Sequence, residues 1–511
     1  MNPRLETWNV EDQEFWESTG RRVARRNLWI SIPCLLCAFA VWLYWSVITV
    51  QMQNLGFPFT KEELYTLSAI AGLVGATLRI PNSFFIALCG GRNVIAVTTL
   101  LLVAPALGAG LALKNPDTSY TTFAVLAGLS GIGGGAFASS MSNISFFFPK
   151  RMQGLALGLN AGLGNVGVSV MQVLLPWAMT VSLFGSLGGG PRHLPEALGG
   201  GPVWIQNCGL VWVPVLLVLA AAAWFGMNNL PQHRVGPAPA AIARMLWLLI
   251  LGLGTGGLGL YLLLGSGWSM WLVLPVTIVL TVLAMRWVAP EQVRSNLAGQ
   301  FVIFRNSHNW IMTWLYTMTF GSFIGYSAAF PKLIQDVFGS LPDGSLNPNA
   351  PNPLAYAWLG PLVGSLVRPV GGWLSDRVGG ARVTHWDTVV MIASALGVAW
   401  CVRAAGASDT PEEWFLPFLV LFLILFVTTG IGNGSTFRMI PIIFRPEQAG
   451  PVLGWTSAVA AYGAFIIPRV FGSQIQSGTP EYALYGFAVY YLSCLALNWW
   501  FYARRNAPMP C

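Results

Sequence analysis

Three arginines interrupt stretches of sequence that are otherwise apolar. Arg79 lies in the run GATLRIPNSFF, Arg368 in GSLVRPVGGWL and Arg438 in GSTFRMIPIIF. A guanidinium among apolar side chains needs an anion or several hydrogen-bond acceptors, because an unpaired charge is costly to remove from water. These three side chains are therefore the first candidates for a binding site.

Two of the arginines occupy matching positions in an internal repeat. The segment GATLRIPNSFFIALCGGRNV lies without gaps over GSLVRPVGGWLSDRVGGARV, which places Arg79 on Arg368. At similar offsets FPKRMQGLALGLNAGLGNVG lies over FRPEQAGPVLGWTSAVAAYG, and Phe39 falls on Phe320. Parallel repeats are related by an axis along the membrane normal in some transporter folds. The repeat therefore predicts that Arg79 and Arg368 face each other across a central cavity.

Two facing guanidiniums predict a small anion between them. None of the 19 acidic residues is expected in the middle of an apolar run. Asp336 is expected on the outer side and Asp387 at the inner end of a run. The arginine fork offers parallel N–H donors that match a planar oxyanion. The alternative is that both arginines are structural and cap backbone carbonyl groups.

Amide and aromatic side chains near the repeat positions are further candidates. Asn160 and Asn165 could donate amide hydrogens to an anion, although a buried Asn more often bridges two helices. Phe39, Phe137 and Phe320 would ordinarily belong to the core. Because the repeat pairs Phe39 with Phe320, a symmetric aromatic sandwich around an anion is as well supported as a place in the core.

Arg438 and Ser457 are possible secondary contacts. Arg438 is either a rim charge that attracts anions or a direct ligand. The glycine-rich runs GLSGIGGGAFASSMSN and GIGNGSTFRM lack the lysine spacing of a phosphate-binding loop. They predict close packing between helices instead.

The composition excludes most classes of soluble protein. Of 511 residues, 55% are hydrophobic and only 9% charged, with a mean hydropathy of +0.61. Soluble domains carry about 25% charged residues, so a soluble enzyme, a nucleic-acid-binding domain and a disordered scaffold are excluded. The seven Cys show no metal-ligand spacing, and no nucleophile–base set or cofactor motif is present. We expect neither a cofactor nor a metal nor enzymatic activity.

The chain is predicted to be an all-α polytopic membrane protein. An apolar run of about 20 residues crosses a bilayer as a helix. Fourteen such runs begin near Leu28, Leu64, Val94, Thr121, Leu155, Val203, Met245, Met270, Asn309, Leu354, Thr388, Phe415, Pro451 and Tyr482. With the N-terminus in the cytoplasm, 18 of the 27 Lys and Arg lie on the cytoplasmic side, including Arg4 and Arg234. This distribution follows the positive-inside rule, explains the net charge of +8 without nucleic acid, and places both termini in the cytoplasm.

The repeat predicts how the chain is divided. Residues 1–27 form a tail, 28–228 the first six-helix repeat and 309–503 the second, with a short tail over 504–511. The linker 229–308 carries an inserted transmembrane hairpin over about 245–289. The alternative is a fourteen-helix core without a division into two halves.

Several motifs resemble those of one family. GATLRIPNSFF, FASSMSNISFFFPK, LGLNAGLGNVGVSVMQ, TFGSFIGYSAAF, RPVGGWLSDRVGG and GSTFRMIPIIF are similar to segments of the nitrate/nitrite porter family of the major facilitator superfamily. Within it, the chain most resembles the bacterial respiratory nitrate/nitrite antiporters, over nearly all residues except about 230–300. The resemblance implies the major facilitator fold and location in the bacterial inner membrane. It also implies alternating-access exchange of nitrate and nitrite, and we expect a monomer whose only other partner is membrane lipid.

The resemblance also implies the substrate-binding residues. These are two arginines that grip the anion, three phenylalanines that pack around it, and two hydrogen-bond donors: Arg79, Arg368, Phe39, Phe137, Phe320, Asn165 and Tyr316. Two departures stand out. Ala461 occupies the repeat position of Asn165, and Arg438 stands where close relatives have an uncharged polar residue.

Two rival functions remain beside exchange. One is uptake of nitrate with a proton, which needs a titratable group inside the membrane. The other is a membrane sensor that binds nitrate without moving it, although the sequence offers no sizeable soluble domain for signalling. The expected absence of interior carboxylates favours exchange.

Overall fold

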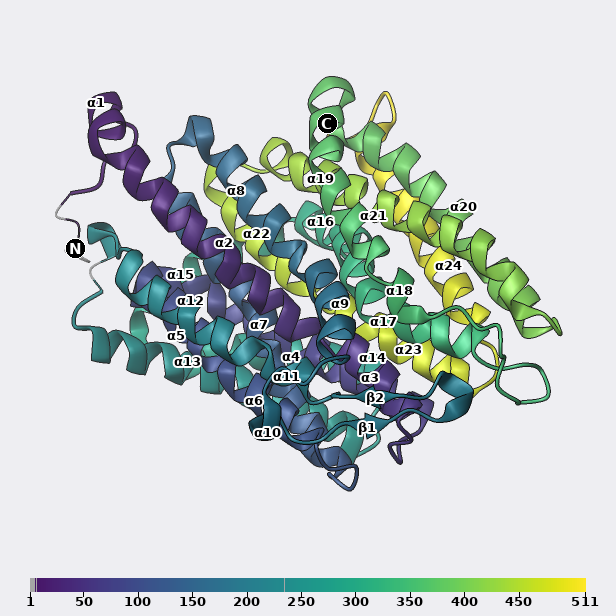
Figure 1. Ribbon diagram of the computed structural model, residues 1–511. Helices are drawn as coiled ribbons and strands as arrows, with labels where there is room; N and C mark the ends of the chain where they lie inside the picture. The colour runs from purple at the N-terminus through teal and green to yellow at the C-terminus, as the bar shows by residue number, and fades with distance from the viewer. Residues whose placement is uncertain (1–4, 6, 234) are drawn as a thin grey trace.

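The computed structural model describes residues 5, 7–233 and 235–511. Long helices lie side by side in one bundle, tilted with respect to one another (Figure 1). In the part of the chain that is described, the named strands are β1 (Arg192–His193) and β2 (Pro202–Val203), which pair antiparallel. Arg4 and Arg234, counted above as cytoplasmic, lie outside the described residues.

The first half begins inside the expected tail, because Asp12 caps a helix by accepting hydrogen bonds from the amides of Glu14 and Phe15. Its elements are α1 (Gln13–Phe15), η1 (Trp16–Gly20), α2 (Arg21–Leu43), α3 (Trp45–Asn54), α4 (Lys61–Cys89), α5 (Gly91–Leu101), α6 (Val103–Ala112), α7 (Tyr120–Phe147), α8 (Lys150–Asn165), α9 (Gly167–Ala178), α10 (Gly185–Gly188), η2 (Glu196–Leu198), α11 (Asn207–Leu210) and α12 (Trp212–Gly226).

A helical hairpin follows, within the linker that the sequence predicts. Its elements are η3 (Pro231–His233), α13 (Ala238–Leu260), η4 (Tyr261–Gly265), α14 (Met270–Trp287), α15 (Glu291–Gln300) and η5 (Phe301–Arg305). Helix α13 packs along α4, where Gly252 lies against Leu78 and Pro81.

The second half contains α16 (Ser307–Tyr316), η6 (Thr317–Gly321), α17 (Ser322–Phe338), α18 (Pro353–Tyr356), α19 (Leu359–Val378), α20 (Gly380–Gly406), η7 (Pro411–Trp414), α21 (Phe415–Ile443), α22 (Pro446–Ala460), α23 (Gly463–Gln476), α24 (Glu481–Asn498) and η8 (Trp499–Ala503). Element η6 is a single π-helical turn inside an otherwise continuous helix. Such turns occur often at functional sites.

Segments paired by the sequence repeat have matching local structure. Helix α4 ends at Gly90 with φ +80°, and α19 ends at Gly379 with φ +95°, a region that glycine enters without strain. The helix from Lys150 breaks after Asn165, and the helix from Pro446 breaks after Ala460. Helix α4 packs on α7 as α19 packs on α21.

The glycine-rich runs hold the two arginine helices close to their neighbours. A Cβ added at Gly134 of α7 would lie 2.9 Å from the Cα of Gly75 on α4. A Cβ at Gly434 of α21 would lie 2.3 Å from the carbonyl oxygen of Arg368 on α19. Both runs therefore act in helix packing, as the sequence predicts.

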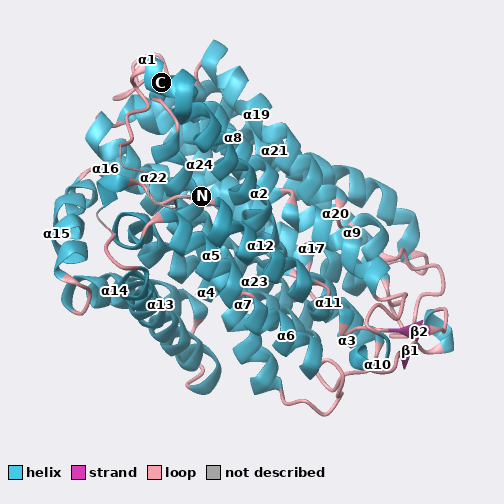
Figure 2. Ribbon diagram, turned by 60° about the vertical axis from the view of Figure 1, so that its left-hand side comes forward, coloured by secondary structure: helices cyan, strands magenta, loops and turns pink. Residues whose placement is uncertain are grey.

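Within the described residues, eleven helical stretches are long and apolar enough to cross a membrane, so this is a multi-pass membrane protein. The fourteen spans predicted from the sequence are thus only partly matched. Helix α1 and the C-terminus lie at one end of the bundle (Figures 1 and 2), which we call the terminal end. The β1–β2 hairpin lies at the opposite end.

Candidate substrate site between the two halves

Arg79 is completely buried in the middle of α4. Its Nε donates to the carbonyl of Gly134 on α7 at 3.0 Å, and its Nη1 donates to both the carbonyl and the hydroxyl oxygen of Ser457 on α22 at 3.1 Å. Its Nη2 has no hydrogen-bond partner in the described structure. Arg79 therefore caps carbonyl groups, as the structural alternative predicts, yet keeps one buried donor for a ligand.

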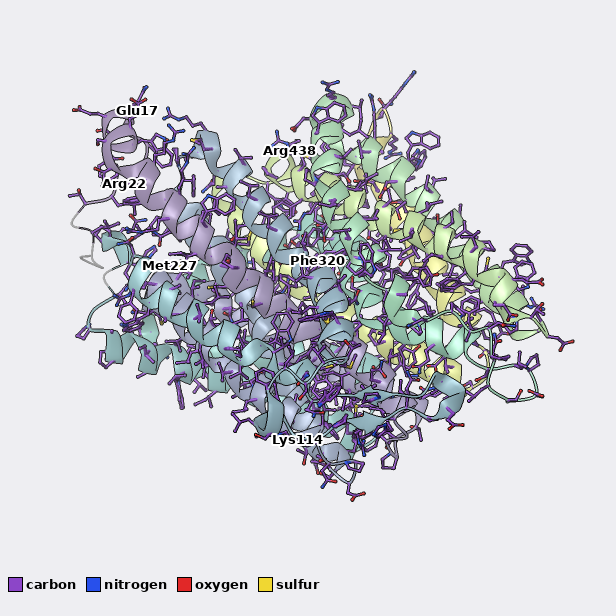
Figure 3. All side chains as sticks on the ribbon, in the orientation of Figure 1. Glu17, Arg22, Lys114, Met227, Phe320 and Arg438 are labelled. Carbon is purple, nitrogen blue, oxygen red and sulfur yellow. The ribbon has the colours of Figure 1, made fainter. Side chains whose placement is uncertain are left out.

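A row of four aromatic rings lies beside Arg79. The Phe137 and Phe320 rings stack with centroids 6.2 Å apart, Phe320 stacks on Tyr316 at 5.7 Å, and Tyr316 contacts Phe437 at 5.8 Å. The Arg79 guanidinium carbon lies 4.8 Å from the Phe137 centroid and 4.9 Å from that of Phe320. Figure 3 shows that Phe320 lies between the two ends of the bundle. The predicted aromatic cluster is thus at mid-depth.

Phe39 and Trp42 complete the cluster from α2. Phe39 is fully buried, with its ring 5.9 Å from that of Phe137. The Arg79 guanidinium carbon lies 5.5 Å from the Trp42 centroid. Trp42 was not among the residues predicted from the sequence, although it follows Phe39 by three residues and so shares its helix face.

Arg368 lies at the other end of the aromatic row. It is half-buried on α19, and its guanidinium carbon is 5.5 Å from the Phe437 centroid. Its Nη1 is buried without a hydrogen-bond partner in the described structure. The Tyr316 hydroxyl lies next to the Arg368 guanidinium but has no partner with hydrogen-bond geometry in the described structure. Arg79, Arg368 and Tyr316 are close enough to act on one another electrostatically. None of the ion pairs found in the described part of the chain involves either arginine.

The remaining candidates lie in different environments. Asn165 is buried at the end of α8 with its Oδ1 unpaired in the described structure, and α8 packs on α2 and α19. Asn160 donates to the hydroxyl of Ser140 on α7 at 2.9 Å, which is the helix-bridging arrangement. Arg438 is 54% exposed near the terminal end and pairs with Asp376 at 2.5 Å (Figure 3). The structure therefore does not bring Asn160 or Arg438 to the aromatic row.

Asp387 corrects an expectation. We expected it at the end of a span, but it lies seven residues inside α20 and only 7% of the residue is exposed. Its Oδ2 has no hydrogen-bond partner in the described structure. The difference arises because helix α20 begins at Gly380, before the apolar run near Thr388, so Asp387 lies inside the helix. The sequence predicted the apolar run, but it did not predict that the helix begins earlier with a polar turn that neighbouring helices bury.

A network of polar side chains joins the two halves at the opposite end. Lys332 and Asp336 of α17 form a buried ion pair at 2.5 Å, and Lys332 also donates to Gln53 of α3. Arg469 of α23 pairs with Glu62 of α4 at 2.6 Å. Asp336 lies near the end of α17, and its carboxylate is fully buried. These contacts hold the two halves together at the end of the bundle opposite the terminal end.

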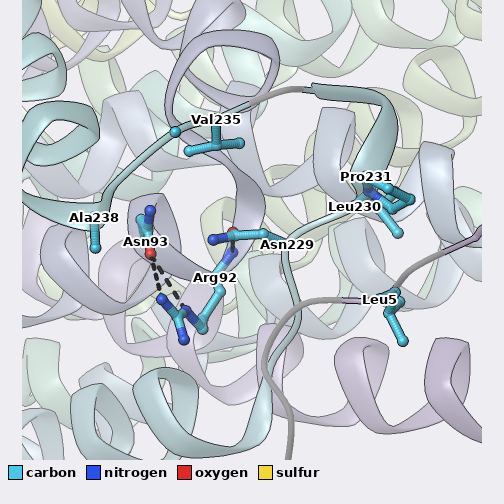
Figure 4. A pocket seen from close by; sticks show the side chains of 9 residues that line it. Leu5, Arg92, Asn93, Asn229, Leu230, Pro231, Val235 and Ala238 are labelled. Atoms are coloured by element: carbon cyan, nitrogen blue, oxygen red, sulfur yellow. Dashed lines mark hydrogen bonds between the residues drawn. The ribbon is translucent and has the colours of Figure 1, made fainter.

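A pocket of about 330 Å³ lies elsewhere, near the linker (Figure 4). The Arg92 guanidinium donates to Asn93 at 3.1 Å, and the Asn229 oxygen accepts from the Arg92 amide at 3.0 Å. None of the predicted substrate-binding residues lines it. The pocket is therefore separate from the arginine pair.

Comparison with known proteins identifies the family. The chain is 39% identical over 507 residues to the probable nitrate/nitrite antiporter NarK2 of Thermus thermophilus, covering 99% of this chain and 97% of that protein. It is 36% identical over 524 residues to the nitrate/nitrite transporter NarU of Escherichia coli strain K12, covering 98% and 96%. No family model matches the chain.

Solved structures identify the fold. A bacterial homologue of the human lysosomal transporter Spinster, inward-facing and unoccupied, superposes with a TM-score of 0.58 at 12% identity. The match covers 93% of this chain and 96% of that one. The predictions of an all-α membrane protein with a major facilitator fold and of the family are confirmed. The chain belongs to the nitrate/nitrite porter family of the major facilitator superfamily, whose members are transporters and not enzymes.

Proposed function

We propose that this protein exchanges nitrate and nitrite across the bacterial inner membrane by alternating access. The observation that carries the proposal is the pair of buried arginine donors without protein acceptors, Nη2 of Arg79 and Nη1 of Arg368, with the Tyr316 hydroxyl between them in the same condition. Relatives at 36–39% identity carry the names nitrate/nitrite antiporter and nitrate/nitrite transporter, which supports the choice of substrates.

The anion binds between the two arginines and against the aromatic row. Nitrate and nitrite are planar monoanions, so one face can lie on Phe320 while the oxygens accept N–H bonds from both forks. Phe39 and Phe137 close the site from the first half, and Asn165 contributes an amide. Water is excluded by these rings, which strengthens each charged hydrogen bond.

The chain is organised as two six-helix repeats over 28–228 and 309–503 with an inserted hairpin in 229–308. This gives fourteen transmembrane helices, the eleven apolar stretches plus the long helices over 307–338, 359–378 and 481–503. The terminal end faces the cytoplasm, supported by the basic residues there. The protein acts as a monomer, since both arginines come from one chain.

Exchange is obligatory because the empty site is electrostatically unfavourable. With no carboxylate paired to either arginine in the described part of the chain, reorientation of the empty carrier would carry two unscreened cations past each other. A bound anion removes most of that repulsion. Each half-cycle therefore carries nitrate or nitrite.

Proton-coupled uptake is the second candidate, favoured by one observation. Asp387 is a buried carboxyl group without a partner in the described structure. A carrier that gained and lost a proton there could link nitrate uptake to a pH gradient.

Flux into purified proteoliposomes tests the two candidates. We expect rapid uptake of nitrate into vesicles loaded with nitrite and very little into empty vesicles, with or without an inward proton gradient. Protein-free vesicles with the same contents measure leakage of nitrous acid. Acid-driven accumulation of nitrate in empty vesicles would replace exchange by symport, and binding without any flux would leave only a sensor.

A further inference from the structure

Asp387 lies directly behind the turn that carries Phe320. A Cβ added at Gly432 of α21 would lie 2.6 Å from Asp387 Oδ2 and 2.6 Å from the Cγ2 of Thr319. Because Gly432 has no side chain, the Asp387 carboxyl of α20 and Thr319 of η6 can both occupy the space beside it. Phe320 follows Thr319 in the same π-helical turn, so a single residue separates the carboxyl from the aromatic row.

The hydroxyl groups around Asp387 are already used elsewhere. Thr384 bonds with Ser435 at 2.7 Å, and Thr319 bonds with Thr436 at 3.2 Å. Thr436 also donates to the carbonyl of Gly432 at 2.7 Å. Oδ2 of the carboxyl thus lies in a polar seam between α20, α21 and η6, where it is buried without a partner in the described structure.

No charged neighbour in the described part of the chain compensates an ionised Asp387. None of the ion pairs found in the described part of the chain includes Asp387. The titratable side chains of the helices around it have other contacts: Arg438 of α21 with Asp376 of α19, Arg368 of α19 with Phe437, Tyr316 of α16 with Phe320, Tyr491 of α24 with Ser322 and Tyr326, Tyr502 of η8 with His308, Arg377 of α19 with Trp373, and His385 of α20 with Trp386. Arg382 of α20 is exposed.

We propose that Asp387 is a proton-binding site that controls access to the conformation described here. A buried carboxyl without a countercharge is stable in a membrane protein as the neutral acid. The helices can therefore close around Asp387 only when it carries a proton. Release of that proton to water requires the seam between α20, α21 and η6 to open, which moves the turn that carries Phe320.

The inference rests on the proposed anion transport and adds a second ligand to it. Because Asp387 meets η6 at Thr319, the residue before Phe320, it is a positioning residue for Phe320. Raising the pH ionises Asp387, depopulates this conformation and slows the cycle. The amide introduced by D387N has the same shape as the acid and stays neutral at every pH.

The experiment compares nitrate-for-nitrate exchange at equal pH on both sides, from about pH 5.5 to about pH 8.5, in proteoliposomes. Labelled nitrate avoids the leak of nitrous acid. For the wild-type protein we expect exchange to fall as the pH rises, by up to about tenfold per pH unit once the group is ionised. D387N should keep its acid-side rate throughout. The matched control is D409N, the same change in the exposed loop after α20, which should follow the wild type.

A second readout does not depend on transport. The infrared spectrum of the purified protein should contain the band of a protonated carboxyl group that D387N lacks. Retention of the band in D387N, or a parallel decline of exchange in D387N and the wild type, would overturn the proton site while leaving anion transport intact. Absence of exchange at every pH in the wild type would instead overturn the proposed function.

Discussion

The two matched arginines occupy equivalent positions in the sequence repeat but have very different surroundings. Arg79 has no exposed surface, three hydrogen bonds and three aromatic rings around its guanidinium. Arg368 is half-buried, and Phe437 is the one aromatic ring found over its guanidinium in the described part of the chain. The repeat therefore determines the backbone positions of the two arginines, while the helices packed around them determine how firmly each side chain is held.

The layer outside each arginine helix explains part of this difference. The hairpin helix α13 covers α4 along Gly252 and Gly256. The outer face of α19 has no comparable cover in the described structure, since Leu366, Val370 and Trp373 are exposed. Arg79 thus belongs to a fixed part of the site, and we expect Arg368 to be the side chain that adjusts when the anion binds.

The largest effect is expected from replacing either arginine by lysine. R79K and R368K each lose paired N–H donors, so substrate affinity should fall roughly 100-fold, as expected for two hydrogen bonds to a charged group. R79K should also lower the melting temperature, because it removes bonds to Gly134 and Ser457, whereas R368K should not. Nitrate flux and thermal unfolding of the purified variants measure both effects.

The control for these variants is R438K. Arg438 is exposed and pairs with Asp376. Its replacement should leave affinity within about threefold of the wild type. Near-normal flux in R368K would remove Arg368 from the site and limit the comparison to Arg79.

Tyr316 tests whether the row between the arginines binds the anion or only fills space. Its hydroxyl has no partner in the described structure, so Y316F should not reduce stability. If the hydroxyl donates to nitrate, its loss should weaken binding about 10-fold, the value of one hydrogen bond to a charge. Calorimetric titration with nitrate measures this. T317V, one residue later on the partly buried side, is the control, and equal affinities of Y316F and wild type would assign Tyr316 to packing.

The hairpin tests whether the cover on α4 matters for binding. Deleting about 236–300 and rejoining the chain before Asn309 should leave both arginines in place, so the nitrate affinity should change less than about fivefold. The melting temperature should fall, because Leu78 and Pro81 lose their contact with Gly252. A monodisperse variant that no longer binds nitrate would make the hairpin part of the functional core.

The sequence predicted which residues lie together where this depends on pattern. The repeat selected Arg79, Arg368, Phe39 and Phe320 as candidates, and the structure places them around one aromatic row. The sequence could not predict that Ser457, rather than an anion alone, accepts from Arg79, since this contact joins helices far apart in the chain. It also did not predict the burial of Asp387. The space for its carboxyl is provided by Gly432 of another helix, and the sequence around Asp387 does not reveal this contact.

The smallest effect is expected at the contact that joins the halves beside Arg79. Nη1 donates to both the carbonyl and the hydroxyl of Ser457, so S457A removes one of two acceptors and leaves the backbone bond. The affinity for nitrate should change by about threefold at most. Because Ser457 belongs to the second half, the lost bond weakens the described conformation and should raise the rate of exchange relative to affinity. Stopped-flow uptake and equilibrium binding separate these quantities, with S473A on the outer part of α23 as the control. A loss of affinity as large as that of R79K would mean that Ser457 organises the anion site itself, and the firmly held half would then owe its rigidity to a single cross-half contact.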